Sequence, residues 1–523
     1  MNRIFSNSIS VCLMLLAWSC QQKSDKTVVE KPNIIYILAD DLGYGDVAAF
    51  NESSKIKTPQ LDLLAAEGMK FTDAHTSSSV CTPTRYGILT GRYNWRSKLK
   101  QGVLTGKSKA LIPNTRTTVA SVLKKGGYNT AYIGKWHLGW DWGTKDSTNA
   151  RGEGWNFKDF DQINYSKPVI NNPNDLGFDY AYGHSGSLDM APYVYVENGR
   201  ATMIPDSVTV NKGKYSWWRE GHTSSDFIHE DVTPNFFRRG IKYVKEHAND
   251  EKPFFLYLPL PSPHTPILPT EEWQDKSGLN PYADFVMMVD DYVGQINAAV
   301  KEAGIEGNTL IIFTSDNGCS PAAKIEEMTE KGHYPSYVFR GHKADIFEGG
   351  HRVPFIAKWP NRIAKGSESN EIICTTDLTA TCASIVGYQL ADSEAEDSYN
   401  ILPLFDQEKL TTPLREATVH HSINGSFAIR QGAWKLIMCP GSGGWSFPRP
   451  NNKKVLEGLP EVQLYNLMND PGEKDNLQAS NPQKVTELKD LLTKYILEGR
   501  STPGVAQQND TGNSWKQLWW IEG

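Results

Sequence analysis

Five long apolar runs, each bounded by polar residues, constrain the fold of this 523-residue chain more than any other feature. They lie at residues 33–41 (NIIYILADD), 129–137 (NTAYIGKWH), 252–260 (KPFFLYLPL), 308–318 (NTLIIFTSDNG) and 353–360 (VPFIAKWP). The apolar residues are continuous instead of alternating with polar ones, which is typical of strands covered on both faces, as in a parallel sheet. Helical patterns such as residues 282–304 separate the runs. The alternation predicts an α/β fold, with a large, mostly parallel sheet flanked by helices.

The pattern changes after a segment near residues 405–415 that has the composition of a linker and contains Pro413. Residues 426–438 have the pattern of two strands joined at Gln431-Gly432, and residues 482–499 form an amphipathic helical pattern. We therefore expect a large domain at residues 32–412. A smaller C-terminal subdomain at residues 413–523 is predicted to hold an antiparallel sheet and one helix.

The N-terminal residues have the pattern of an export signal. Arg3 precedes an apolar run at residues 9–18 that is too short to span a bilayer, and Cys20 follows that run. This resembles a bacterial lipoprotein signal at residues 1–20, followed by a polar tether at residues 21–31. We expect export to the periplasm or outer membrane of a bacterium, with membrane contact only through a lipid anchor on Cys20. Simple secretion is the alternative, because Ala17 and Trp18 fit the lipoprotein pattern imperfectly.

Polar side chains collect at the carboxyl ends of the predicted strands. Asp40 and Asp41 end the first run, and Asp316 and Asn317 end the fourth. The carboxyl ends of parallel strands meet at one edge of a sheet, where ligands bind. These four side chains offer oxygen ligands, which favour calcium, with magnesium as the alternative hard cation. Either segment taken singly is equally well explained as a helix N-cap, and the metal site rests on the two together.

Cys81 stands just before a predicted helix that begins near Pro83 and runs to Gly91. A helix N-terminus binds anions and lowers the pKa of a thiol. A lone cysteine is more often a small buried apolar residue. The other cysteines match no zinc-binding spacing and are too sparse for a disulfide scaffold.

The segment CTPTRYGILTGR, which starts at Cys81, resembles the core motif C-x-P-[ST]-R of the type I, formylglycine-dependent sulfatases of the alkaline-phosphatase-like superfamily. The segments NIIYILADDLGYGD, GKWHLG, SPHTP, TSDNG and RGHKADIFEGGHRVPF agree with the same family in order, and the resemblance covers roughly residues 32–500. It implies a sulfuric ester hydrolase in which a maturation enzyme oxidises Cys81 to the aldehyde formylglycine.

The resemblance also implies the roles of the site residues. Formylglycine at position 81 supplies the nucleophile and shares the cation with Asp40, Asp41, Asp316 and Asn317. Arg85 orients it, and Lys135, Lys343 and, by a weaker match, Ser187 bind the sulfate. His264 is the candidate acid for the leaving oxygen and His137 the candidate base for sulfate release. A phosphatase or phosphodiesterase of the same fold, or a catalytically silent glycan-binding lipoprotein, are the alternatives.

The substrate is less constrained by the sequence. A net charge of −6 without a basic face makes nucleic acid an improbable partner. An exported enzyme meets sulfate esters mainly on glycans, and tryptophan suits sugar rings. Aromatic and polar clusters lie at Trp140 with Trp142, Trp217 with Trp218, and His333 with Tyr334. We expect residues 187–193 and the insert between Asn317 and Lys343 to enclose a pocket for a terminal sugar, 6-sulfated galactose or N-acetylgalactosamine.

Overall fold

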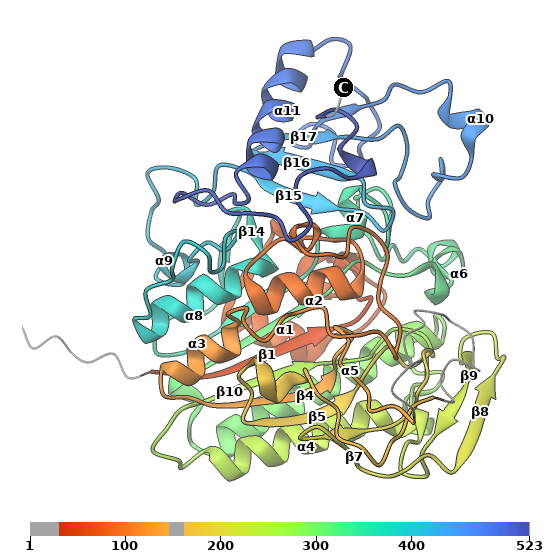
Figure 1. Ribbon diagram of the computed structural model, residues 1–523, viewed down its shortest axis with the longest axis vertical. Coiled ribbons are helices and arrows are strands. Elements are labelled where there is room, and N and C mark those ends of the chain that lie inside the picture. The colour runs from red at the N-terminus through yellow and green to blue at the C-terminus, as the bar shows by residue number, and fades with distance from the viewer. Residues whose placement is uncertain (1–30, 146–161, 522–523) are drawn as a thin grey trace, which may run out of the picture. The chain divides into compact units, whose positions relative to one another are not determined.

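A computed structural model describes residues 31–145 and 162–521 (Figure 1). The predicted export signal and most of the predicted tether lie outside the described residues. Within the described part of the chain, no helix combines the length and the apolar composition needed to cross a bilayer.

One sheet of ten strands organises the molecule, in the order β13-β2-β12-β11-β1-β10-β4-β5-β6-β7. Its strands are β1 (Asn33–Ala39), β2 (Met69–Phe71), β4 (Asn129–Lys135), β5 (Tyr180–His184), β6 (Val196–Glu197), β7 (Arg200–Ala201), β10 (Phe254–Pro259), β11 (Thr309–Ser315), β12 (Phe355–Lys358) and β13 (Ser367–Ser369). The central strands β11, β1, β10, β4 and β5 are parallel, as predicted. The strand predicted at residues 353–360 is β12, and it runs antiparallel to β11. A strand covered on both faces is apolar throughout whichever way it runs, so its composition does not reveal its direction.

Helices cover both faces of the sheet, so alternate residues of a strand belong to different cores (Figure 1). Ile35 and Ile37 of β1 pack in the core that includes α1 (Pro59–Ala66), α4 (Val232–His247) and α5 (Pro281–Glu302). Tyr36 and Leu38 pack in the opposite core, with α2 (Cys81–Thr90), α3 (Val119–Lys125) and α8 (Leu378–Val386). Burial on both faces explains the continuous apolar runs in the sequence.

A second, antiparallel sheet of four strands lies in the C-terminal part, in the order β15-β16-β17-β18, with α11 (Pro482–Leu497) packed on it (Figure 1). Its strands are β15 (Thr418–His421), β16 (Phe427–Gln431), β17 (Trp434–Ile437) and β18 (Gln463–Asn466). Gln431 pairs with Trp434 around the predicted turn, which confirms the hairpin. The described residues from Lys31 onward form a single compact unit, and the boundary at residue 413 stays a prediction.

The remaining elements are short. Two further pairs of strands are β3 (Ala74–His75) with β14 (Ile373–Cys374) and β8 (Ser207–Asn211) with β9 (Trp218–Thr223). The short α-helices are α6 (Ile325–Glu330), α7 (Glu348–His351), α9 (Leu402–Phe405) and α10 (Lys453–Leu456).

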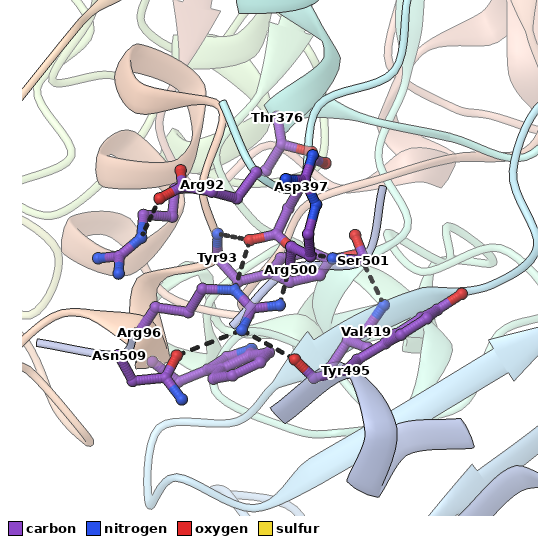
Figure 2. Close-up of polar contacts among 12 residues, drawn as sticks. Arg92, Tyr93, Arg96, Thr376, Asp397, Val419, Tyr495, Arg500, Ser501 and Asn509 are labelled. Atoms are coloured by element: carbon purple, nitrogen blue, oxygen red, sulfur yellow. Dashed lines mark hydrogen bonds and ion pairs between the residues drawn. The ribbon is translucent and has the colours of Figure 1, made fainter. Parts of the chain in front are cut away.

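A buried ion pair ties the segment after α2 to the C-terminal part of the chain. Figure 2 shows Arg96 facing Asp397, with Nε and Nη2 donating to the two carboxylate oxygens over 2.7 and 2.8 Å. Arg96 also donates to the carbonyl of Tyr495 in α11 over 2.9 Å, and the Asp397 carboxylate accepts the backbone N–H of Ser501 over 3.0 Å. Both charged side chains are fully buried. Arg96 therefore links the segment after α2 to both Asp397 and α11.

Candidate active site

The parallel strands deliver the predicted polar residues to one edge of the sheet. Asp40 follows β1, Lys135 ends β4 and Asp316 follows β11. The Lys135 ammonium donates to Asp40, and Lys343 Nζ donates to Asp41 Oδ2 over 2.8 Å. All of these side chains are buried. The edge thus holds several charges of both signs away from bulk water.

The oxygen-bearing side chains fit a hard cation. Asp40, Asp41 and Asp316 are carboxylates, and the Asn317 amide donates to Asp41 Oδ1 over 2.7 Å. Asn317 Oδ1 is buried and has no hydrogen-bond partner within the described structure. A bare amide oxygen beside buried carboxylates is the donor set that calcium or magnesium prefers. The predicted ligands are therefore together and chemically suited to the ion.

Crowding perturbs the titration of the carboxyls. Burial would raise the pKa of Asp40, but the Lys135 ammonium and further nearby cations hold that pKa well below its ordinary value. Burial and the Asp40 carboxylate raise the pKa of Asp316 to about 7. A divalent cation bound among them would favour the ionised form of each carboxyl.

Cys81 is the first residue of α2, with Val80 as the N-cap, so it lies inside the helix and not before it as predicted. Its Sγ lies 3.6 Å from Asp40 Oδ1. The expectation of a lowered thiol pKa is also wrong, because burial raises the pKa of Cys81 to about 12. Desolvation outweighs the helix N-terminus and the positive charges of Lys135 and Lys343 here. Cys81 in its encoded form is therefore a poor nucleophile.

Arg85 lies one helical turn after Cys81 and is fully buried. Its Nε and Nη2 donate to Asp316 Oδ2 over 3.0 and 2.7 Å, and Nη1 donates to the Lys135 carbonyl over 3.1 Å. The guanidinium therefore joins α2 to the ends of β11 and β4. It holds Asp316 directly, and it lies on the same helix as residue 81.

The two predicted catalytic histidines differ in how their nitrogens are used. His137 Nε2 lies 2.9 Å from the Leu104 carbonyl and donates to it, which leaves Nδ1 buried without a partner. Burial and the Lys135 charge lower the pKa of His137 well below its usual range, so its free nitrogen is an acceptor. His264 Nδ1 faces the Thr265 carbonyl and Ser187 Oγ, and its Nε2 lies 3.6 Å from Asp41 Oδ2. Burial and Lys343 lower the pKa of His264.

The residues predicted to bind sulfate surround the same spot. Lys135 Nζ donates to Ser187 Oγ over 3.2 Å, and Ser187 Oγ lies 3.1 Å from His264 Nδ1. Lys343, which follows the insert after Asn317, donates to Asp41. The structure therefore brings every predicted site residue to one place.

A cavity of about 350 Å³ opens onto Cys81. Besides Cys81, His137, His264 and Lys343, its walls include Val103, Asp189, Met190, Trp217, Arg219, Ser320, Pro321, Ala322, Ile423 and Trp445. Asp189 and Met190 belong to the segment 187–193, and residues 320–322 to the insert after Asn317, so both segments enclose the pocket as expected. Asp189 is 4% exposed, pairs with Arg219 through one oxygen and leaves Oδ1 without a hydrogen-bond partner.

Of the aromatic clusters that we expected to bind sugar, only part lines the pocket. Trp217 lines the pocket, but Trp140 is 1% exposed and packs in the core that includes α2, α3 and α8. Trp218 stacks on His229 with ring centroids 3.9 Å apart. His333 is fully buried while Tyr334 is 55% exposed, so the two do not form one surface. Tryptophan packs and binds sugars by the same flat apolar face, so its presence in a sequence does not separate the two roles.

Sequence reasoning missed Trp445 and Arg219 as pocket residues. Trp445 lies in the C-terminal part of the chain, far from every motif, and its backbone N–H donates to Asp345 Oδ1 over 2.7 Å. Arg219 could have been found through its position next to the Trp217-Trp218 pair. A larger cavity of about 510 Å³, lined by residues including Gln101, Glu461 and Trp519, contains none of the predicted site residues.

Comparison with known proteins agrees with this geometry. The model of the Sulfatase family matches residues 32–388. The chain belongs to the sulfatase family. It is similar to an N-acetylgalactosamine-6-O-sulfatase of Bacteroides thetaiotaomicron, with 31% identity over 520 residues that cover 91% of this chain and 96% of the relative. It is also similar to human arylsulfatase A, with 31% identity over 494 residues, covering 92% of this chain and 91% of the relative.

A solved structure from work on glycosaminoglycan metabolism by Bacteroides thetaiotaomicron has a TM-score of 0.76 and 31% identity, covering 89% of this chain and 99% of that one. The sulfatase is thus a sulfuric ester hydrolase with the alkaline-phosphatase-like fold. Both the family and the fold class predicted from the sequence are confirmed.

Proposed function

We propose that this sulfatase hydrolyses sulfate monoesters of glycans through a formylglycine formed from Cys81. The observation that carries the proposal is the place of Cys81, at the floor of the pocket between Asp40 and the lysines at positions 135 and 343. Burial raises the pKa of this thiol to about 12, so the encoded cysteine is unsuited to act as a thiolate. Its Sγ stands where an oxygen of the hydrated aldehyde would lie.

The reaction would take place in two steps. One hydroxyl of the hydrated aldehyde gives its proton to water and attacks sulfur, and the bond between sulfur and the ester oxygen breaks. The leaving oxygen takes a proton from His264. The second hydroxyl then gives its proton to His137, the carbonyl reforms, and sulfate leaves with the electrons of the bond between carbon and oxygen. Water hydrates the aldehyde again.

The histidine environments support these roles. His137 is neutral and has a free buried nitrogen, as a general base requires. His264 lies beside Ser187 and Asp41, at the pocket wall where an ester oxygen would leave. The free protein favours neutral His264, and the negative charge of a bound sulfate ester would raise the affinity of this imidazole for a proton.

A calcium ion, with magnesium as the alternative, is proposed to be held by Asp40, Asp41, Asp316, Asn317 and residue 81. The ion would supply positive charge that offsets the carboxylates and the sulfate. Lys135 and Lys343 contact the same carboxylates, so they are placed to share this charge and to bind sulfate oxygens.

A terminal sugar fits the pocket. Trp217 and Trp445 offer flat apolar faces, and Asp189 Oδ1 with the Arg219 guanidinium offers an acceptor and donors for sugar hydroxyls. Together with the 6-O-sulfatase relative, these walls favour an exo-acting enzyme on 6-sulfated N-acetylgalactosamine or galactose. We further propose export as a bacterial lipoprotein and modification of Cys81 by a maturation enzyme.

Turnover on a panel of defined sulfated mono- and oligosaccharides, beside an aryl sulfate and a phosphate monoester, tests the proposal. We expect the 6-sulfated galacto sugars to be the best substrates, and the Cys81→Ala variant to lose activity on all sulfates. Asp189→Asn is expected to raise KM for the sugars and to spare the aryl ester. Turnover of phosphate but of no sulfate would contradict the proposed chemistry, and equal losses on sugar and aryl ester in Asp189→Asn would contradict the sugar contact.

A further inference from the structure

His333 drew attention in the sequence and has no place in the pocket. It is fully buried and lies within the insert whose residues 320–322 line the pocket. His333 Nδ1 accepts the backbone N–H of Lys55 over 3.2 Å. Its Nε2 therefore carries the proton and donates to Asp46 Oδ1 over 2.8 Å. The His333 imidazole thus links the backbone at Lys55 to the buried carboxylate of Asp46.

Asp46 connects His333 to Tyr282. The second oxygen of Asp46 accepts the backbone N–H of Gly43 over 2.8 Å and lies 2.5 Å from the Tyr282 hydroxyl. Tyr282, on the first turn of α5, also places that hydroxyl 3.0 Å from the Asp41 carbonyl oxygen. The single hydroxyl proton of Tyr282 can be donated to either oxygen, so this residue links Asp46 to the Asp41 carbonyl.

Asp41 needs such support because of its backbone. Successive side chains of a strand point to opposite faces, yet the carboxylates of Asp40 and Asp41 lie in one cluster with Cys81 and His264. The chain achieves this with a left-handed conformation at Asp41, whose φ is +67°. A residue with a Cβ adopts this conformation only where its surroundings hold it there.

The turn after Asp41 is held just as closely. Gly45 donates its N–H to the Pro335 carbonyl over 2.7 Å, and a Cβ at Gly43 would lie 2.4 Å from the same oxygen. The segment at Pro335, near His333, therefore packs tightly against the turn at residues 43–46. Three of these contacts reach the backbone of residues 41–45, at the Asp41 carbonyl and the N–H groups of Gly43 and Gly45.

We propose that Tyr282, Asp46 and His333 form a positioning unit that holds Asp41 in its left-handed conformation, so that Asp40 and Asp41 converge on one cation. The inference rests on the proposed metal site. None of the three side chains reaches the pocket cavity, so they are positioning residues and not catalytic ones. Residues that orient metal ligands typically change metal affinity by roughly 10- to 100-fold when removed.

Calcium binding to the metal-free protein, measured by titration calorimetry, tests this without turnover. We expect Tyr282→Phe to raise the calcium Kd by roughly 10- to 100-fold. Tyr128→Phe is the matched control, because its hydroxyl also donates to a carbonyl, that of Pro32 over 2.7 Å, away from the site. The control is expected to keep the wild-type Kd, and the two metal-free variants are expected to unfold at similar temperatures.

A second pair of variants guards against misfolding of Tyr282→Phe. His333→Ala is expected to weaken calcium binding, and His333→Gln, which keeps a donor for Asp46, to recover part of it. Wild-type affinity in Tyr282→Phe or His333→Ala, or an equal loss in Tyr128→Phe, would overturn the positioning unit and leave the proposed sulfatase chemistry standing. Failure of the wild-type protein to bind calcium or magnesium would overturn the metal site and this inference together.

Discussion

The surroundings of Cys81 and the two histidines determine what each can do. Cys81 begins a helix, which favours a thiolate, but it is buried beside carboxylates, which disfavours one more strongly. The sequence predicted the residue and its motif correctly and its ionisation wrongly. Helix position is readable from Pro83 and Gly91, whereas desolvation depends on separate strands, such as β1, β4 and β11, that the fold brings together.

His264 should matter in proportion to the basicity of the leaving oxygen. If it protonates that oxygen, His264→Ala loses roughly 10²- to 10⁴-fold in kcat on sugar sulfates and much less on activated aryl sulfates, whose leaving group needs no proton. His137→Ala is the matched comparison, and its loss is expected to be similar for both classes, with a sulfated enzyme accumulating. Rates for a series of leaving groups check this. An equal loss on both classes in His264→Ala would contradict the assignment.

Strands and helices were easier to predict than their directions and partners. The runs that became β1, β4, β10 and β11 were recognised because burial on both faces leaves a continuous apolar pattern. The antiparallel direction of β12 was not, because direction is set by the connection and leaves no trace in composition. The Arg96–Asp397 pair, which joins distant segments, was also invisible in the sequence.

Removal of Arg96 should destabilise the fold without touching the pocket. Arg96→Ala leaves the Asp397 carboxylate buried without its partner, which typically costs about 3–5 kcal/mol of unfolding free energy. Arg238→Ala is the control, because its pair with Asp231 is exposed and contributes about 1 kcal/mol or less. Urea unfolding of both variants measures the difference. Similar small losses in the two would show that the buried pair does not anchor the segment after α2.

The whole molecule buries many histidines in neutral form, which gives its stability a pH dependence. Burial lowers the pKa of His184, His229 and His421 to about 3. The pKa values of five others are also lowered, namely His75, His137, His264, His351 and His420. Unfolded chains bind these protons below about pH 6.5, so their contribution to stability is present above that pH and is lost as the pH falls.

Several carboxyls act in the opposite direction, among them Asp62 and Asp377, whose pKa values are raised by burial. Burial raises the pKa of Asp290, Asp316 and Glu473 to about 7, so these groups take up protons in the folded state first. The histidines outnumber these carboxyls. Each histidine whose effect no carboxyl offsets lowers the unfolding free energy by about 1.4 kcal/mol for every pH unit below its unfolded pKa. We therefore expect the unfolding free energy to fall between pH 6.5 and pH 5, as measured by urea titrations across that range. A free energy that is constant or rises toward pH 5 would contradict this balance.

The assembled site was predictable in its members and not in its walls. The Sulfatase-like motifs and the strand ends identified the residues that meet at the sheet edge. Trp445 and Arg219 were missed because they reach the pocket only through the folding of loops with no pattern of their own. Chemistry that depends on strand ends is therefore readable from this sequence, and specificity that depends on loops is not.

The mass of the peptide that contains residue 81, taken from active protein, tests the central claim most directly. The protein is expressed with a sulfatase-maturation enzyme, digested, and compared with protein expressed without one. We predict formylglycine in place of Cys81 in the active preparation, and unmodified cysteine with little sulfatase activity in the other. Full sulfatase activity from protein whose residue 81 is an unmodified thiol would contradict the account.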